Sequence, residues 1–188
     1  APARSLLLTS PDIPNGQFPA WHARRTISGP VSGGAALAEY LFNDSHIHLT
    51  NYVQEGPDIR DYLAMMGDKI GRSVLFGLPV QQFWSHAEMG DTPPTYYMMS
   101  DASLYYYSFT DAYLAMQYRS LDADGRARFD PMITGFNPAD MFAADHVRRV
   151  LTTFPGVFCG LGEFSVIKEF VSSKIAGEKA TLGNPALG

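Results

Sequence analysis

Residues 44–49 of this chain read DSHIHL, which places two histidines two positions apart at the end of an apolar run. Side chains alternate in direction along a β-strand, so a strand here points His46 and His48 to one face and Ile47 to the other. Two imidazole nitrogens on one face form a compact pair of ligands for zinc, iron, nickel or copper. Such pairs also arise by chance, but the position of this one at a strand end predicts a metal site.

The sequence around this stretch alternates between strand-like and helix-like segments from residue 40 onward. Apolar spacing predicts, in chain order, a strand over 40–49, a helix over 58–70, a strand over 73–80, a helix over 102–118, a strand over 129–136, a helix over 137–153, a strand over 157–164 and a helix over 168–176. This order is typical of a parallel sheet covered by helices. A (β/α)8 TIM barrel takes about 250 residues. We therefore expect an α/β fold in which this chain supplies roughly the first four βα units of such a barrel.

The composition is that of a soluble globular protein. The chain has 188 residues, of which 46% are hydrophobic, with a net charge of -5 and a pI near 5.4. It has no basic cluster for nucleic acid or an anionic membrane, and no apolar segment of the ~18–20 residues that span a bilayer. We expect a soluble protein with a small-molecule substrate, either cytoplasmic or exported after cleavage of a signal peptide.

The first 39 residues differ from the rest of the chain. They carry prolines at positions 11, 14, 19 and 30 and a glycine-serine patch at residues 32–34. Such a composition breaks helices and favours extended backbone or loops. The predicted organisation is therefore an extended N-terminal arm over residues 1–39, followed by a barrel segment over residues 40–188.

Three further residues are expected to lie outside the site. The single cysteine, Cys159, excludes an intrachain disulfide and lies in an apolar run, which favours a buried and unreactive thiol. His146 falls within a predicted helix beside two arginines, and we expect it on the helix surface. His86 lies in a polar and aromatic loop.

Polar residues gather where the expected strands end. In a parallel barrel the working residues stand at the carboxyl ends of the strands, where the loops meet. His46 and His48 end the first strand, and Glu163 ends the fourth. The expected substrate-binding residues follow the second and third strands and are Gln81, Trp84 and Asn137. Asn137 is also expected to cap the helix that follows it.

These motifs resemble the amidohydrolase superfamily, in its metal-dependent hydrolase and decarboxylase branch. DSHIH at residues 44–48 matches that family's first-strand His-x-His signature, and GLGEF at residues 160–164 is similar to its fourth-strand motif. The resemblance implies a (β/α)8 barrel with one or two divalent ions, usually zinc, with manganese or iron as alternatives. It also implies that His46 and His48 are ligands, and that Glu163 is a ligand or bridging group.

The resemblance covers only the N-terminal half of that pattern. Family members take further histidines from the fifth and sixth strands and an aspartate from the eighth, and the sequence reaches Gly188 before such strands occur. We expect either a fragment of a longer enzyme or a half-barrel that completes its sheet with another chain, for example as a homo-oligomer. An open half-sheet would otherwise leave two strand edges unpaired.

The expected function is hydrolysis of an amide or ester-type carbonyl bond in a small molecule by a metal-activated water. Glu163 and Asp44 are the expected catalytic carboxylates, with Asp44 fixing the tautomer of a histidine. Two simpler roles stay open, because Asp44 also suits a strand-end bond to nearby backbone and Glu163 a salt bridge to Lys168. The alternative functions are a non-oxidative decarboxylase and a catalytically incomplete half-barrel with a binding or structural role.

Overall fold

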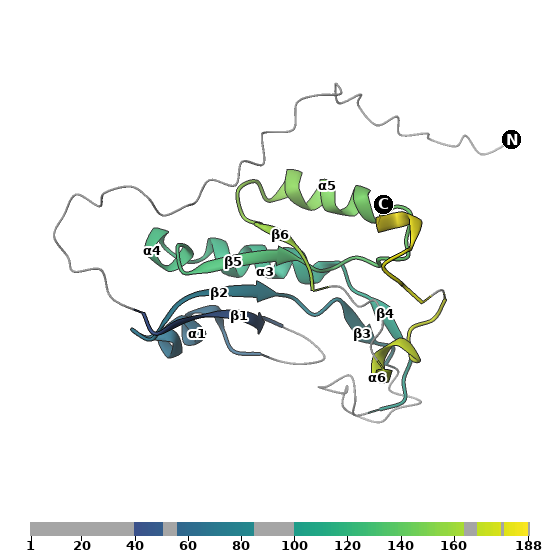
Figure 1. The fold of residues 1–188 in the computed structure, drawn as a ribbon, viewed down its shortest axis with the longest axis horizontal. Coiled ribbons are helices and arrows are strands. Elements are labelled where there is room, and N and C mark those ends of the chain that lie inside the picture. Colours follow the sequence, from purple (N-terminus) through teal and green to yellow (C-terminus); the bar gives the residue numbers. More distant parts are fainter. Residues whose placement is uncertain (1–39, 51–55, 85–99, 164–168, 178, 188) are drawn as a thin grey trace, which may run out of the picture. The chain divides into compact units, whose positions relative to one another are not determined.

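The computed structural model describes residues 40–50, 56–84, 100–163, 169–177 and 179–187, all within one compact unit formed by residues 38–188. The main sheet has four strands in the order β1-β2-β5-β6, and each neighbouring pair is parallel (Figure 1). Its strands are β1 (Phe42–His48), β2 (Ile70–Phe76), β5 (Phe129–Ile133) and β6 (Gly160–Leu161). The fold is therefore α/β with a mainly parallel sheet. The expected arm over residues 1–39 lies outside the described residues.

Helices lie between the strands of this sheet and after its last strand, and three of them contribute buried residues to its core. They are α1 (Ile59–Met66), α3 (Phe109–Arg119), α4 (Ala123–Arg126), α5 (Ala143–Thr153) and α6 (Glu169–Ser172), with a 3-10 turn at Pro185–Leu187. Leu75 of β2 and Ile133 of β5 are buried in one cluster with Ile59 and Met66 of α1 and Leu114 of α3. None of the described helices is long and apolar enough to cross a membrane.

Strand β1 contains an irregularity that decides which way its side chains point. Asp44 pairs with Ser73 and Ile47 pairs with Leu75, so β1 advances three residues while β2 advances two. The additional residue is a β-bulge, and it shifts the alternation of side chains by one position. As a result Asp44 and Ile47 both face the buried side of the sheet, and His48, opposite Phe76, faces the other side.

A second, antiparallel sheet corrects two of the predicted elements. Strand β3 (Val80–Gln82) pairs with β4 (Leu104–Tyr106), and the two pack against α6 through Val80, Leu104 and Val171. The helix predicted over 102–118 is thus a strand followed by α3, and the strand predicted over 73–80 is two strands in different sheets. Residues 104–106 read LYY, and aromatic residues favour strands when a partner strand is present.

The last two units are shorter than predicted. The helix expected from Asn137 begins only at Ala143, because Asn137 and Asp140 close two turns by accepting bonds from the amides of Ala139 and Phe142. Strand β6 has two residues, and the following helix is the single turn α6. Cys159 is exposed rather than buried, because it stands just before the short edge strand β6, and its Sγ lies 3.6 Å from Asp130 Oδ1.

Candidate metal centre

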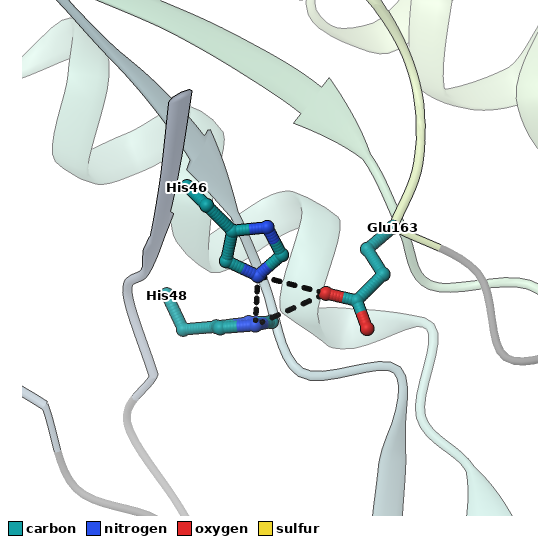
Figure 2. Close-up of side chains that lie close together, drawn as sticks. All are labelled: His46, His48 and Glu163. Carbon is teal, nitrogen blue, oxygen red and sulfur yellow. Dashed lines mark hydrogen bonds and ion pairs between the residues drawn. The ribbon is translucent and has the colours of Figure 1, made fainter. Parts of the chain in front are cut away.

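Three side chains converge at the carboxyl ends of β1 and β6. His46 Nε2 lies 2.8 Å from Glu163 Oε2, His48 Nε2 lies 3.4 Å from the same oxygen, and the two nitrogens are 3.0 Å apart (Figure 2). The three form a group whose donor atoms are close enough to share one metal ion. The structure thus brings together the three residues that the sequence predicts as ligands, and it identifies a possible metal-binding triad.

The spacing of the donors fits a first-row divalent ion. Zinc binds histidine nitrogen at about 2.0–2.1 Å and carboxylate oxygen at about 2.0–2.2 Å, so two donors at a tetrahedral angle lie about 3.3 Å apart. The separations of 2.8, 3.0 and 3.4 Å differ from that value by at most about 0.5 Å. Two histidines and one glutamate are also a donor set found in catalytic zinc sites.

His48 is held in the tautomer that a metal ligand requires. Its Nδ1 lies 2.9 Å from the carbonyl oxygen of Gly77, and a carbonyl only accepts hydrogen bonds. His48 Nδ1 therefore carries a hydrogen, which leaves Nε2 as the ring nitrogen available to bind a metal at the centre of the triad. The sequence predicts that the carboxylate of Asp44 fixes the tautomer of a histidine. In the structure the backbone carbonyl of Gly77 has this role for His48.

Phe76 forms an apolar wall beside the two imidazoles. Its ring centroid lies 4.8 Å from that of His46 and 6.0 Å from that of His48. Phe76 is opposite His48 in the register of β1 and β2, so the parallel ladder itself puts the aromatic ring on the histidine face. The phenyl ring therefore packs beside both imidazoles of the triad.

The three residues of the triad come from the two opposite edges of the main sheet. In a flat sheet, three interstrand spacings of ~4.8 Å separate the edge strands by about 14 Å. His46 is in β1, and Glu163 stands two residues beyond β6, yet their donor atoms are 2.8 Å apart. The two side chains, together with the backbone that follows β6, therefore bridge the separation between the edge strands.

The triad is open to solvent on one side. The side chains of His46, Glu163 and His48 are 51%, 35% and 28% exposed. Among the described residues, no further histidine, cysteine or carboxylate joins the group. Structural zinc sites are closed by four protein ligands, whereas catalytic sites have three and keep a position for water or substrate. The donor count and exposure resemble the catalytic kind.

Asp44 lies on the other side of β1, away from the triad. Its Oδ1 accepts a hydrogen bond of 3.0 Å from the backbone amide of His46, and its Oδ2 accepts one of 2.7 Å from the hydroxyl of Tyr62. This is the strand-end role that the sequence left open as the alternative for Asp44. The carboxylate stabilises the bulge by satisfying the amide of His46, and it thereby positions the first histidine through the backbone.

The three expected substrate-binding residues have other surroundings. Gln81 does not follow β2 directly but is buried in β3, with its Oε1 3.5 Å from the hydroxyl of Tyr105. Trp84 is 36% exposed just beyond β3. Asn137 uses its side-chain oxygen to close a turn. None of the three belongs to the triad, and their role in binding substrate stays a prediction.

His146 corrects another expectation. Instead of lying on the surface of α5 its side chain is only 16% exposed, and its Nε2 lies 2.7 Å from Oδ2 of Asp111 in α3. Asp111 itself is 1% exposed. The helical periodicity around His146 contained no signal for this contact, because the partner is on another helix. His86 lies outside the described residues.

A scan of protein-family models and searches of curated proteins and solved structures find no match to this chain. The properties of the centre therefore rest on its own geometry.

Proposed function

We propose that this chain carries a catalytic divalent-metal site, with zinc as the resident ion, and that it hydrolyses an amide or ester bond of a small molecule. The observation that carries the proposal is the convergence of His46 Nε2, His48 Nε2 and Glu163 Oε2 within 3.4 Å of one another on an open face of the sheet. This arrangement agrees with the resemblance of the sequence to the metal-dependent branch of the amidohydrolase superfamily.

The same proposal extends to the architecture. The parallel strands follow the order of the chain, and side chains from its first strand and from just beyond its last strand meet at one site. Both features are expected of consecutive βα units in a (β/α)8 barrel, where the site stands at the carboxyl ends of the strands. We infer that the described unit is one part of such a barrel and that β3 and β4 form an excursion from it.

The residues of the triad have distinct tasks in this mechanism. His48, oriented by the Gly77 carbonyl, and His46, packed on Phe76, supply neutral nitrogen donors. Glu163 supplies the only negative charge of the three donors, so a divalent ion held here keeps a net positive charge. Such an ion, when bound, lowers the pKa of its water ligand toward neutrality and polarises a substrate carbonyl.

Zinc titration of the full chain tests the proposal directly. After treatment with a chelator, the chain is titrated with zinc alone by isothermal calorimetry, and hydrolysis is measured with a panel of amides and esters. We expect zinc to bind, and His48→Ala and Glu163→Gln to weaken binding by more than about 100-fold, beyond the loss typical of an outer-shell residue. Hydrolysis should disappear with chelation and return with zinc.

Asp145→Asn serves as the matched control for Glu163→Gln. Asp145 is an exposed carboxylate on α5 that pairs with Arg148, so its removal also subtracts one negative charge but leaves the triad intact. Its zinc affinity should equal that of the unsubstituted chain. Equal zinc affinity in Glu163→Gln and Asp145→Asn would contradict the proposed site. Zinc binding with release of carbon dioxide instead of hydrolysis would favour the decarboxylase, and binding with neither activity the incomplete half-barrel.

A further inference from the structure

We propose that Thr134 is a positioning residue for Glu163, and that Asp111 anchors Thr134 for this purpose. The inference rests on the proposed function, because it concerns how the third ligand of the metal centre is held. Glu163 follows a strand of only two residues, so the short ladder between β5 and β6 does little to fix the carboxylate. Other contacts must hold the backbone at this point.

Both backbone groups of Gly162, the residue before Glu163, are bonded to the end of β5. The Gly162 amide donates to the carbonyl of Ile133 at 2.9 Å, and the Gly162 carbonyl accepts a bond of 2.9 Å from the Thr134 hydroxyl. Thr134 is 0% exposed, so this hydroxyl bond is shielded from water. The peptide group that joins Gly162 to Glu163 is therefore oriented by the side chain of Thr134.

Thr134 is in turn held by a buried carboxylate. Oδ1 of Asp111 accepts hydrogen bonds from the amides of Thr134 at 2.8 Å and Gly135 at 3.0 Å, and Oδ2 accepts a second bond from Gly135 at 3.1 Å. His146 Nε2 lies 2.7 Å from Oδ2. Asp111 is 1% exposed and would be costly to bury without such partners. The carboxylate of α3 thus fixes the backbone just after β5.

The close approach of α3 to this backbone depends on Gly135. A Cβ at position 135 would stand 2.8 Å from Oδ2 of Asp111 and 3.0 Å from the Cα of Ser108. Both distances are too short for ordinary contact, so residue 135 has no room for a side chain. The buried contacts therefore run from Asp111 through Thr134 to Gly162, and they end at the ligand Glu163.

This arrangement predicts a specific effect of the Thr134 hydroxyl on metal binding. Ligands of a functional site must be held to within ~0.5 Å of the productive geometry by the residues behind them. Without the hydroxyl, the Gly162 carbonyl loses its buried partner, and the peptide before Glu163 loses one of the contacts that orient it. The loss of an outer-shell partner lowers metal affinity 10–100-fold in typical sites.

A pair of substitutions at one position separates positioning from packing. Thr134→Val keeps the shape of the side chain and removes the hydroxyl, whereas Thr134→Ser keeps the hydroxyl and removes a methyl group. We expect zinc affinity, measured with the metal alone, to fall about 10-fold in Thr134→Val and to change less than about 2-fold in Thr134→Ser. Cobalt substitution gives a second readout, because its visible absorption spectrum reports the geometry of the bound ligands.

Each outcome has a defined meaning. Unchanged zinc affinity and an unchanged cobalt spectrum in Thr134→Val, with binding still lost in His48→Ala, would overturn the positioning role and leave the proposed function standing. Absence of zinc binding in the unsubstituted chain would overturn both. If circular dichroism shows that Thr134→Val does not fold, Thr134→Ala replaces it, and equal affinities in Thr134→Ala and Thr134→Ser would overturn the inference.

Discussion

Replacing Tyr62 with phenylalanine should destabilise the protein by about 2 kcal/mol, because it removes the hydroxyl that holds the bulge of β1. The Tyr62 hydroxyl donates a bond of 2.7 Å to Asp44 Oδ2 and lies 2.9 Å from the hydroxyl oxygen of Ser73. Tyr62 is 7% exposed, and burial raises its pKa above the usual value, so the hydroxyl stays a donor at neutral pH. Phenylalanine fits the same space but leaves Asp44 Oδ2 without this donor.

The magnitude follows from the kind of bond that is lost. A hydrogen bond to a charged group contributes about 1.5–3 kcal/mol, and the neutral bond to Ser73 adds about 1 kcal/mol. Partial access of water to Asp44 and the easier burial of phenylalanine offset part of this sum, which leaves about 2 kcal/mol. For a domain of this size that difference lowers the melting temperature by about 4–8 °C.

Urea denaturation provides the assay, since a change of midpoint at constant slope reports a change in the free energy of unfolding. Tyr106→Phe is the matched control, because the Tyr106 hydroxyl has no hydrogen-bond partner among the described residues, and it should change the free energy by less than about 0.5 kcal/mol. Equal midpoints for Tyr62→Phe and Tyr106→Phe would refute the reasoning. So would full additivity of Tyr62→Phe with Asp44→Ala, because contacting residues should couple by at least about 0.5 kcal/mol.

Two further predictions concern Gly77 and Tyr106. Gly77→Ala should lower the free energy of unfolding, measured by urea denaturation, by about 1–3 kcal/mol, because its Cβ would lie 2.1 Å from Oγ1 of buried Thr110. It should also weaken zinc binding, because the displaced backbone would move the carbonyl that orients His48. Unchanged stability would contradict the close packing. Burial raises the pKa of Tyr106 above 10.0, so the folded state holds its proton longer than the unfolded state. Its contribution to the free energy of unfolding is full below pH 10 and is lost as pH rises through the raised pKa. Stability should therefore fall less between pH 9 and 11 in Tyr106→Phe, and equal losses would contradict this prediction.

The three residues of the candidate metal centre could be predicted because their signals are local or follow from a general rule. The spacing of His46 and His48 predicts both rings on one face of a strand, and the two rings do meet, although the bulge between Asp44 and Ile47 includes His46. The position of Glu163 at the same edge follows from the rule that parallel strands bring their carboxyl ends together, and its expected role as a ligand comes from the resemblance of GLGEF to the family motif. These two arguments needed no knowledge of the contacts between distant parts of the chain.

The groups that orient the ligands could not be predicted in this way. Tyr62, Gly77 and Thr134 reach the site through contacts between elements far apart in the sequence, and nothing in their own periodicity marks them. The strand β4 was mistaken for the start of a helix for the same reason, since a short aromatic segment becomes a strand only when a partner such as β3 is present. The local sequence pattern therefore predicts which residues are the donors, whereas tertiary contacts determine how their side chains are oriented.

The donor atoms of the triad come from the two edges of the main sheet, and this arrangement affects folding. Contacts between distant segments carry the largest loop-closure cost and tend to form late. A cation bridging β1 and Glu163, two residues beyond β6, would meet its full set of donors only in the completed sheet. A bound cation would therefore slow unfolding, because β1 or β6 could separate from the sheet only after its bonds to the cation break. The cation would be released at that step, before the buried core unfolds.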